Sequence, residues 1–176
     1  MDSFKHTVPT AGAGQATFSQ CWLASFGMMY KYYNQPVGSI ETKLTAKGID
    51  IADAKANGLS DKDYAKAGEA LGMTLFAGGP YKKPQGTFDV GDSDGCEAFL
   101  AELVKGPLWV SRYVGSGYHI VVAVGYRNPS WDEPGYIIFN NPFPGPTNAI
   151  EDGSMRGNIF VKHITDARGS VMAYRS

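Results

Sequence analysis

The sequence contains few of the residues on which several classes of protein depend. Its 176 residues include two cysteines, Cys21 and Cys96, and three widely spaced histidines. A single cysteine pair excludes the dense disulfide framework of a small secreted domain, and we expect both thiols to be reduced. There is no Cys-x-x-Cys pair, and three separated histidines do not form a zinc-site pattern. We therefore expect a chain that folds on a hydrophobic core without disulfides or a structural metal.

The sequence also lacks long apolar runs and an excess of one charge. Its longest strongly apolar run, Ile120–Val124, is far too short to span a bilayer, and the first ten residues contain no apolar signal-peptide core. The formal net charge is −1, and Lys and Arg are scattered, so there is no basic surface for nucleic acid or anionic lipid. We expect a soluble protein with no Sec signal peptide, no transmembrane segment and no nucleic-acid partner.

The chain is of single-domain size, and neither a repeat nor a linker divides residues 1–176. Residues 1–14 lack periodicity and are expected to form an extended or flexible arm. Helical patterns begin after Ser19, Ser39, Ser60 and Asp92 or Ser93, and they stop at Asn34, Gly48, Gly72 and Gly106. Runs typical of strands cover Leu108–Val114, Tyr118–Tyr126, Tyr136–Asn140, Asn158–Ile164 and Val171–Tyr174. This order predicts an α+β fold in which an N-terminal helical half packs on a C-terminal antiparallel β-sheet.

Cys21 lies at the apparent start of the first helix. The helix dipole and unpaired backbone N–H groups stabilise a thiolate there, and the same N–H groups can hold an oxyanion. Gln15, six positions earlier, is placed to supply a second oxyanion donor, with Gln20 as its less well aimed competitor. Taken alone, a cysteine on an apolar helix is more often a packed core thiol, and helical spacing predicts that role for Cys96.

A nucleophilic cysteine needs a base, and His119 opens the most apolar strand, YHIVVAVGY. Successive side chains of a strand point to opposite faces of the sheet, so His119 shares one face with Val121, Ala123 and Gly125. Because this face narrows to small residues, we expect the helix that begins at Cys21 to dock there and to bring thiol and imidazole together. Alone, His119 could equally be a buried structural histidine. Solvated or peripheral roles are expected for His6, in the N-terminal arm, and for His163, on a late strand.

A basic imidazole needs a third group that fixes its tautomer and orientation. The strand that begins at Tyr136 ends in Asn140 and Asn141, directly before Pro142. Active-site side chains can project from strand ends without interrupting the ladder. An asparagine amide oxygen at this end can accept a hydrogen bond from Nδ1–H of His119, and both asparagines are candidates.

These motifs resemble those of the papain-like cysteine peptidases. The most similar group is the small bacterial one that includes the AvrRpt2-type effector peptidases, and the bacteriocin-processing peptidases of ABC exporters are more distant. The shared pattern is Gln15 six positions before Cys21-Trp22, His119 before an apolar strand, and Asn141 directly before a proline. Four further short segments resemble those of the same small peptidases, so the resemblance covers most of the chain. They are Gly48-Ile49-Asp50, Gly58-Leu59, Ala70-Leu71-Gly72 and Gly106-Pro107-Leu108-Trp109.

The resemblance implies a papain-like fold and a peptidase that hydrolyses peptide bonds of a protein substrate through a thioester, with no metal or organic cofactor. It implies Cys21 as nucleophile, His119 as general base and acid, and Gln15 as oxyanion donor. Cys21 and His119 are expected to form an imidazolium–thiolate pair. The orienting residue is Asn141, and Asn140 remains the alternative because many small relatives carry Asp at this place. Trp131 and Phe143, in loops near the expected site, are candidates for substrate contacts.

The same resemblance implies a monomeric bacterial effector or toxin. Such a protein is cytoplasmic in the producing cell and is delivered to a host or rival cell by a specialised secretion system, with a secretion component or a cognate inhibitor as partner. Two other functions fit the same residues. One is a papain-like deamidase or transamidase that acts on glutamine, and the other is a non-catalytic binding or self-processing module.

Overall fold

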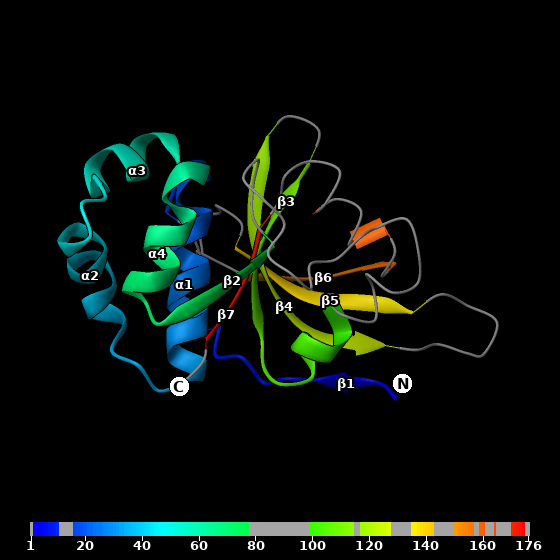
Figure 1. Cartoon of the computed structure of the whole chain (residues 1–176). Helices are drawn as coiled ribbons and strands as arrows, with labels where there is room; N and C mark the ends of the chain where they lie inside the picture. Colours follow the sequence, from blue (N-terminus) through cyan, green and yellow to red (C-terminus); the bar gives the residue numbers. More distant parts are fainter. Residues whose placement is uncertain are drawn as a thin grey trace.

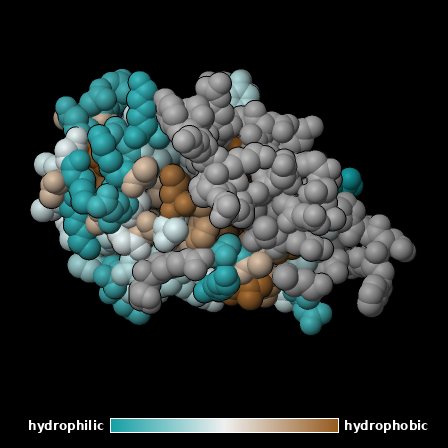
Figure 2. Space-filling model, in the orientation of Figure 1, coloured by the Kyte–Doolittle hydropathy of each residue, from teal (hydrophilic) through white to brown (hydrophobic). Residues whose placement is uncertain are grey.

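The computed structural model describes residues 2–10, 16–77, 99–114, 117–127, 135–142, 150–156, 159–160, 164 and 170–174. The helices of residues 21–70 lie on one side of an antiparallel sheet, and the first of them, α1 (Cys21–Tyr32), packs against the strands (Figure 1). This arrangement confirms the expected α+β fold. On the face shown in Figure 2, hydrophilic side chains cover the helices, and apolar surface is visible where the helices meet the sheet. None of the described helices is long and apolar enough to cross a bilayer.

The helical layer follows the expected order, with one addition. After α1 come α2 (Ile40–Ala46), α3 (Ile51–Asn57) and α4 (Tyr64–Ala70), with 3₁₀ turns η1 (Phe18–Gln20), η2 (Val37–Ser39) and η3 (Asp61–Asp63). The addition is the short helix α3, whose N-cap is Asp50. The Asp50 carboxylate accepts a hydrogen bond from Asp53 N at 3.0 Å. Ser19 is not the N-cap of α1, because Gln20 holds that position. Instead, Ser19 Oγ donates to Lys55 O at 2.6 Å and ties η1 to α3.

The strands form one sheet in the order β2-β7-β3-β4-β5-β6, with β1 paired to β4, and all pairs are antiparallel. Their bounds are β1 (Phe4–Lys5), β2 (Met73–Ala77), β3 (Leu108–Tyr113), β4 (Tyr118–Arg127), β5 (Tyr136–Pro142), β6 (Ile150–Arg156) and β7 (Ser170–Tyr174). Four of these match expected strands, whereas β1, β2 and β6 were not expected. The expected strand over residues 158–164 is wrong where the chain is described, because residues 159–160 and 164 are helical.

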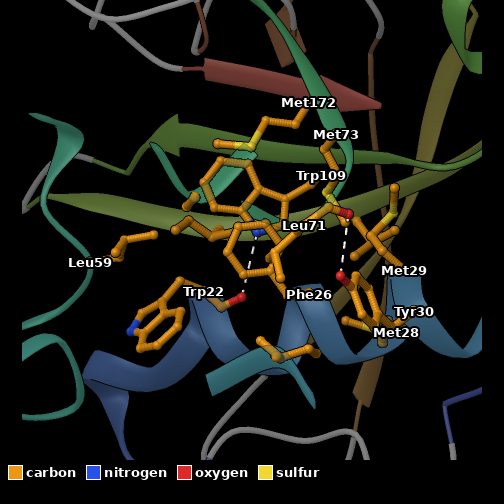
Figure 3. Packing of buried hydrophobic residues seen from close by; sticks show 14 of the residues in the cluster. Trp22, Phe26, Met28, Met29, Tyr30, Leu59, Leu71, Met73, Trp109 and Met172 are labelled. Atoms are coloured by element: carbon orange, nitrogen blue, oxygen red, sulfur yellow. Dashed lines mark hydrogen bonds between the residues drawn. The ribbon is translucent and has the colours of Figure 1, made fainter. Parts of the chain in front are cut away.

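A hydrophobic core joins α1 to one face of the sheet (Figure 3). Trp22 and Phe26 of α1 and Trp109 of β3 are fully buried, and the rings of Phe26 and Trp109 stack with their centroids 5.1 Å apart. Trp109 Nε1–H donates to Trp22 O at 3.5 Å, so the polar atom buried with these rings is paired. Truncating one such ring to alanine typically costs about 3–5 kcal/mol. This core therefore fixes where the first residue of α1 lies on the sheet.

The face of β4 on which α1 docks is the opposite of the expected one. The core beneath α1 contains the branched residues Ile120, Val122 and Val124. Val121 and Ala123 belong to a second core on the other face of the sheet, together with Phe99 and Leu103 of the helical residues 99–103. The expectation was wrong because β4 is buried on both faces, so alternation alone does not show which face receives the helix.

The N-terminal arm contributes to the sheet through β1. Gly125 of β4 allows the close approach of this strand, since a Cβ at that position would lie 2.8 Å from Lys5 Cα. His6 follows β1, and it is half-buried instead of solvated. Its Nε2 lies 2.6 Å from Leu103 O, and its Nδ1 lies 3.2 Å from the hydroxyl of Tyr32. These contacts hold the arm against both α1 and the segment after residue 99.

Candidate active site

Cys21 is the first residue of α1 and is 6% exposed. η1 leads directly into it, and no side chain caps the start of the helix. The thiol lies within hydrogen-bonding reach of the Ile120 backbone on β4. One turn further along α1, Ser25 Oγ donates to Ile120 O at 3.3 Å. α1 therefore presents Cys21 to β4 at the residue that follows His119.

His119 and Asn141 are joined by a hydrogen bond between Nε2 and Oδ1 at 2.5 Å. The sheet register explains why Asn141 makes this bond. Asn140 is paired with Val122, which places Asn140 on the face covered by α1, and Asn141 lies on the face of His119. The bonded nitrogen is Nε2, not the expected Nδ1, so Nδ1 is free of this contact.

A pocket of ≈ 580 Å³ opens beside Cys21. Its buried part is formed by Trp22, Leu59, Tyr64 and Ile120, and its exposed part includes Phe18, Asp61 and Tyr118. Pockets for small ligands typically measure roughly 300–1,000 Å³. The space next to the thiol is therefore large enough for one or two side chains of a peptide.

Residues 3–156 match the family described as the papain-like cysteine protease AvrRpt2. The chain belongs to this family. The matched range runs from the N-terminal arm to the end of β6 and contains Cys21, His119 and Asn141. The resemblance to AvrRpt2-type papain-like proteases is thereby confirmed, and with it the papain-like fold. A search of curated proteins and a search of solved structures gave no match.

Burial sets the protonation states in this AvrRpt2-family site. Burial raises the pKa of the Cys21 thiol. Backbone hydrogen bonds oppose this shift, and the one from Ile120 has the largest effect. Burial lowers the pKa of the His119 imidazole, which the bond to Asn141 opposes and the charge of Arg112 reinforces. Both shifts favour neutral thiol and neutral imidazole at neutral pH. They oppose the resting imidazolium–thiolate pair expected from the sequence.

Arg112 on β3 is the register partner of His119 on β4. The residue is 8% exposed, and its Cζ lies 4.9 Å from the ring centroid of Phe139 and 5.9 Å from that of Phe160. Its Nε has no hydrogen-bond partner, and the guanidinium forms no ion pair with any described residue. Burial lowers its pKa, but an arginine stays charged at any physiological pH. Among the described residues, the positive charge beside His119 is therefore contacted by aromatic rings and by Met155 Sδ, to which Nη1 donates at 3.9 Å, and by no carboxylate.

Several predicted residues lie outside the described part of the chain: Gln15, Trp131, Phe143, Cys96 and His163. Gln20, the alternative oxyanion donor, is the N-cap of α1 and makes no side-chain cap bond. Within the described residues, no group of His, Cys, Asp or Glu could hold a metal ion.

Three residues of this region were not identified from the sequence: Asp61, Tyr64 and Arg112. The signal at Ser60 marks the start of a helix, but it does not show that this start approaches Cys21. Arg112 would have required the register of β3 against β4, which depends on contacts between distant parts of the chain.

Proposed function

We propose that this protein is a cysteine peptidase that hydrolyses peptide bonds of a protein substrate. The observation that carries the proposal is the convergence of three elements at the start of β4. Cys21 of α1 lies against Ile120, and the preceding residue, His119, is bonded to Asn141 of β5. Membership of the AvrRpt2 family of papain-like proteases supports it. In this proposal Cys21 is the nucleophile, His119 the base and acid, and Asn141 the orienting residue.

The hydrogen bond to Asn141 selects the tautomer that the reaction needs. A neutral imidazole carries one N–H, and an amide oxygen can only accept. With Nε2–H donated to Oδ1 of Asn141, Nδ1 of His119 has a free lone pair. In this proposal that nitrogen takes the proton from Cys21. In the described structure Cys21 contacts the Ile120 backbone and makes no hydrogen bond to His119, so the expected contact between thiol and imidazole is not formed. The reaction therefore requires the imidazole to turn toward the thiol at the start of β4.

The reaction begins from neutral partners. Nδ1 of His119 takes the thiol proton as Sγ of Cys21 attacks the carbonyl carbon of the scissile amide. Backbone N–H groups at the start of α1 hold the oxyanion, with Gln15 as the second donor that the sequence pattern assigns. The imidazolium then protonates the leaving amine, and the acyl group remains on sulfur as a thioester. Water, deprotonated by His119, hydrolyses the thioester and restores the thiol.

Other parts of the sequence interpretation stay predictions. They are substrate contacts of Trp131 and Phe143, delivery by a secretion system, a cognate inhibitor and a monomeric state.

N-terminal proteomics tests the proposal directly. A candidate host proteome is incubated with the wild type, Cys21→Ala or His119→Ala, and new N-termini are labelled and sequenced. We expect a set of new N-termini that only the wild type produces. A mass shift of glutamine residues without cleavage would replace the proposal by a deamidase, and identical proteomes with all three proteins would contradict any hydrolytic role.

A further inference from the structure

Among the described residues that line the pocket beside Cys21, Asp61 is the single charged one. It begins η3, is exposed, and lies at the outer part of the pocket, where Phe18 and Tyr118 are also exposed. The deeper wall is apolar or aromatic and includes Leu59 and Tyr64. A substrate side chain that enters this space meets aromatic walls and one negative charge.

Asp61 differs from the other acidic residues of the helical layer because its carboxylate has no partner in the described structure. Residues 40–70 contain six acidic side chains, and the other five are engaged. The engaged pairs are Glu41 with Lys55, Asp50 with Asp53 N, Asp53 with Asn57, Asp63 with Lys66 and Glu69 with Lys47. The Asp61 backbone carbonyl accepts from Tyr64 N–H, but its carboxylate makes neither a hydrogen bond nor an ion pair with a described residue, although Lys62 is its neighbour in the chain. A single uncompensated anion therefore lies at the pocket that contains the nucleophile.

The other polar side chains of the pocket already have partners. Ser19 Oγ donates to the α3 backbone, Asn57 Nδ2 donates to Asp53, and Tyr64 OH lies 3.2 Å from Ser111 Oγ. Burial raises the pKa of Tyr64 to about 12, and the negative charge of Asp61 adds to this shift. The carboxylate is therefore close enough to act on the pocket wall, and a neutral polar substrate group would find few open partners there.

These features match one class of side chain. Lysine and arginine have a long aliphatic stem that packs on apolar and aromatic surface, while the cationic head stays near water and an acidic partner. Aromatic rings such as those of Phe18, Tyr64 and Tyr118 also attract a cation at their faces. A glutamate in the same place would meet the charge of Asp61 and be disfavoured.

We propose that this pocket binds a lysine or arginine side chain of the substrate, next to the scissile bond, with Asp61 as its counter-ion. The inference rests on the proposed peptidase activity and names its substrate class: protein segments that carry a basic residue at one position beside the cleaved bond. Asp61 sets specificity and takes no part in bond cleavage.

The test compares pairs of fluorogenic peptides that differ only in charge: arginine against citrulline, and lysine against norleucine, placed in turn at each position around a cleaved bond. We expect one position at which the wild type prefers the charged member by roughly three- to tenfold in kcat/KM, the effect of a partly exposed ion pair with an aromatic contact. In Asp61→Asn this ratio should fall toward one. In Asp61→Lys, glutamate should be preferred over glutamine at the same position.

Asp63→Asn is the matched control, because Asp63 lies in the same 3₁₀ turn, carries the same charge and is paired with Lys66 outside the pocket. It should keep the wild-type ratio. Peptides that are cleaved with no charge preference, or an equal loss of preference in both variants, overturn this inference and leave the peptidase proposal standing. Failure of the wild type to cleave any peptide or protein more than Cys21→Ala does would overturn both.

Discussion

Asn141→Ala removes the hydrogen bond between Asn141 and the imidazole of His119. The bond is 2.5 Å long and half-buried, and its donor is positively charged whenever His119 is an imidazolium. Hydrogen bonds to charged groups contribute about 1.5–3 kcal/mol, so the loss predicts a fall in kcat/KM of roughly 10- to 150-fold. The bond also raises the pKa of His119 against the effect of burial. Its removal should lower that pKa further and shift the acid limb of the pH profile to lower pH.

The assay is kcat/KM against pH on a cleaved peptide, with the pKa of His119 followed by NMR of its ring protons. Asn140→Ala is the matched control, since Asn140 is the neighbouring buried asparagine on the opposite face of β5. It should lower the melting temperature without moving the His119 pKa, whereas Asn141→Asp, which keeps an acceptor, should recover part of the activity. If Asn141→Ala retains activity within twofold while Asn140→Ala abolishes it in a folded protein, the assigned orienting residue is wrong.

Three further predictions concern charge, packing and alkaline stability. Arg112→Met removes the positive charge opposite His119, so the His119 pKa and the acid limb of kcat/KM should rise, while Arg112→Lys should keep the wild-type profile. An unchanged limb would limit Arg112 to packing. Gly125→Ala forces a side chain into β1 and should lower the free energy of unfolding in urea by about 1–3 kcal/mol. Gly117→Ala, whose Cβ meets nothing within 4 Å, is the control, and equal losses in both variants would contradict the close approach of β1. Tyr64 has a pKa of about 12, so the folded state keeps a proton that the unfolded chain loses near pH 10. The free energy of unfolding of the wild type should therefore fall by about 1 kcal/mol between pH 9 and 11 relative to that of Tyr64→Phe, and parallel pH curves would refute this.

Local signals predicted the elements that carry the candidate site. The apolar periodicity after Cys21 and the stop at Asn34-Gln35-Pro36 are short-range features, and the observed α1 ends at Tyr32. The strand that begins at Tyr118 is strongly apolar and was expected nearly to its observed length. These predictions needed only neighbours along the chain, and they placed both proposed reacting groups at the ends of regular elements.

Predictions failed where distant contacts decide the structure. β6 reads as a turn because it contains charged residues and Gly153, yet it pairs along the whole of β5. A Cβ at Gly153 would overlap the ring of Phe139, so glycine is required there by packing across the sheet. The choice between Asn140 and Asn141 likewise depends on the register of β4 against β5. A one-residue change in register reverses which face each side chain occupies.

The short elements failed for a different reason. β1 consists of two residues, and α3 has seven. Two residues cannot show a period, whereas α3 is as long as α2 and α4, which the sequence did predict. Isolated helices of seven residues are unstable in water. Both exist because they dock: β1 on β4 at Gly125, and α3 on η1 through the bond from Ser19 to Lys55.

The central claim is that Cys21 is a nucleophile activated by His119, and the rate of modification by a peptidyl epoxide tests it most directly. Native wild type and His119→Ala are treated with the reagent, and the site is mapped by mass spectrometry, with Cys96 in the same chain as the internal reference thiol. We predict one equivalent of label, confined to Cys21, and a rate that falls by at least about 100-fold in His119→Ala. Equal labelling of Cys21 and Cys96 in the native protein, or a Cys21 rate that does not depend on His119, would contradict the claim.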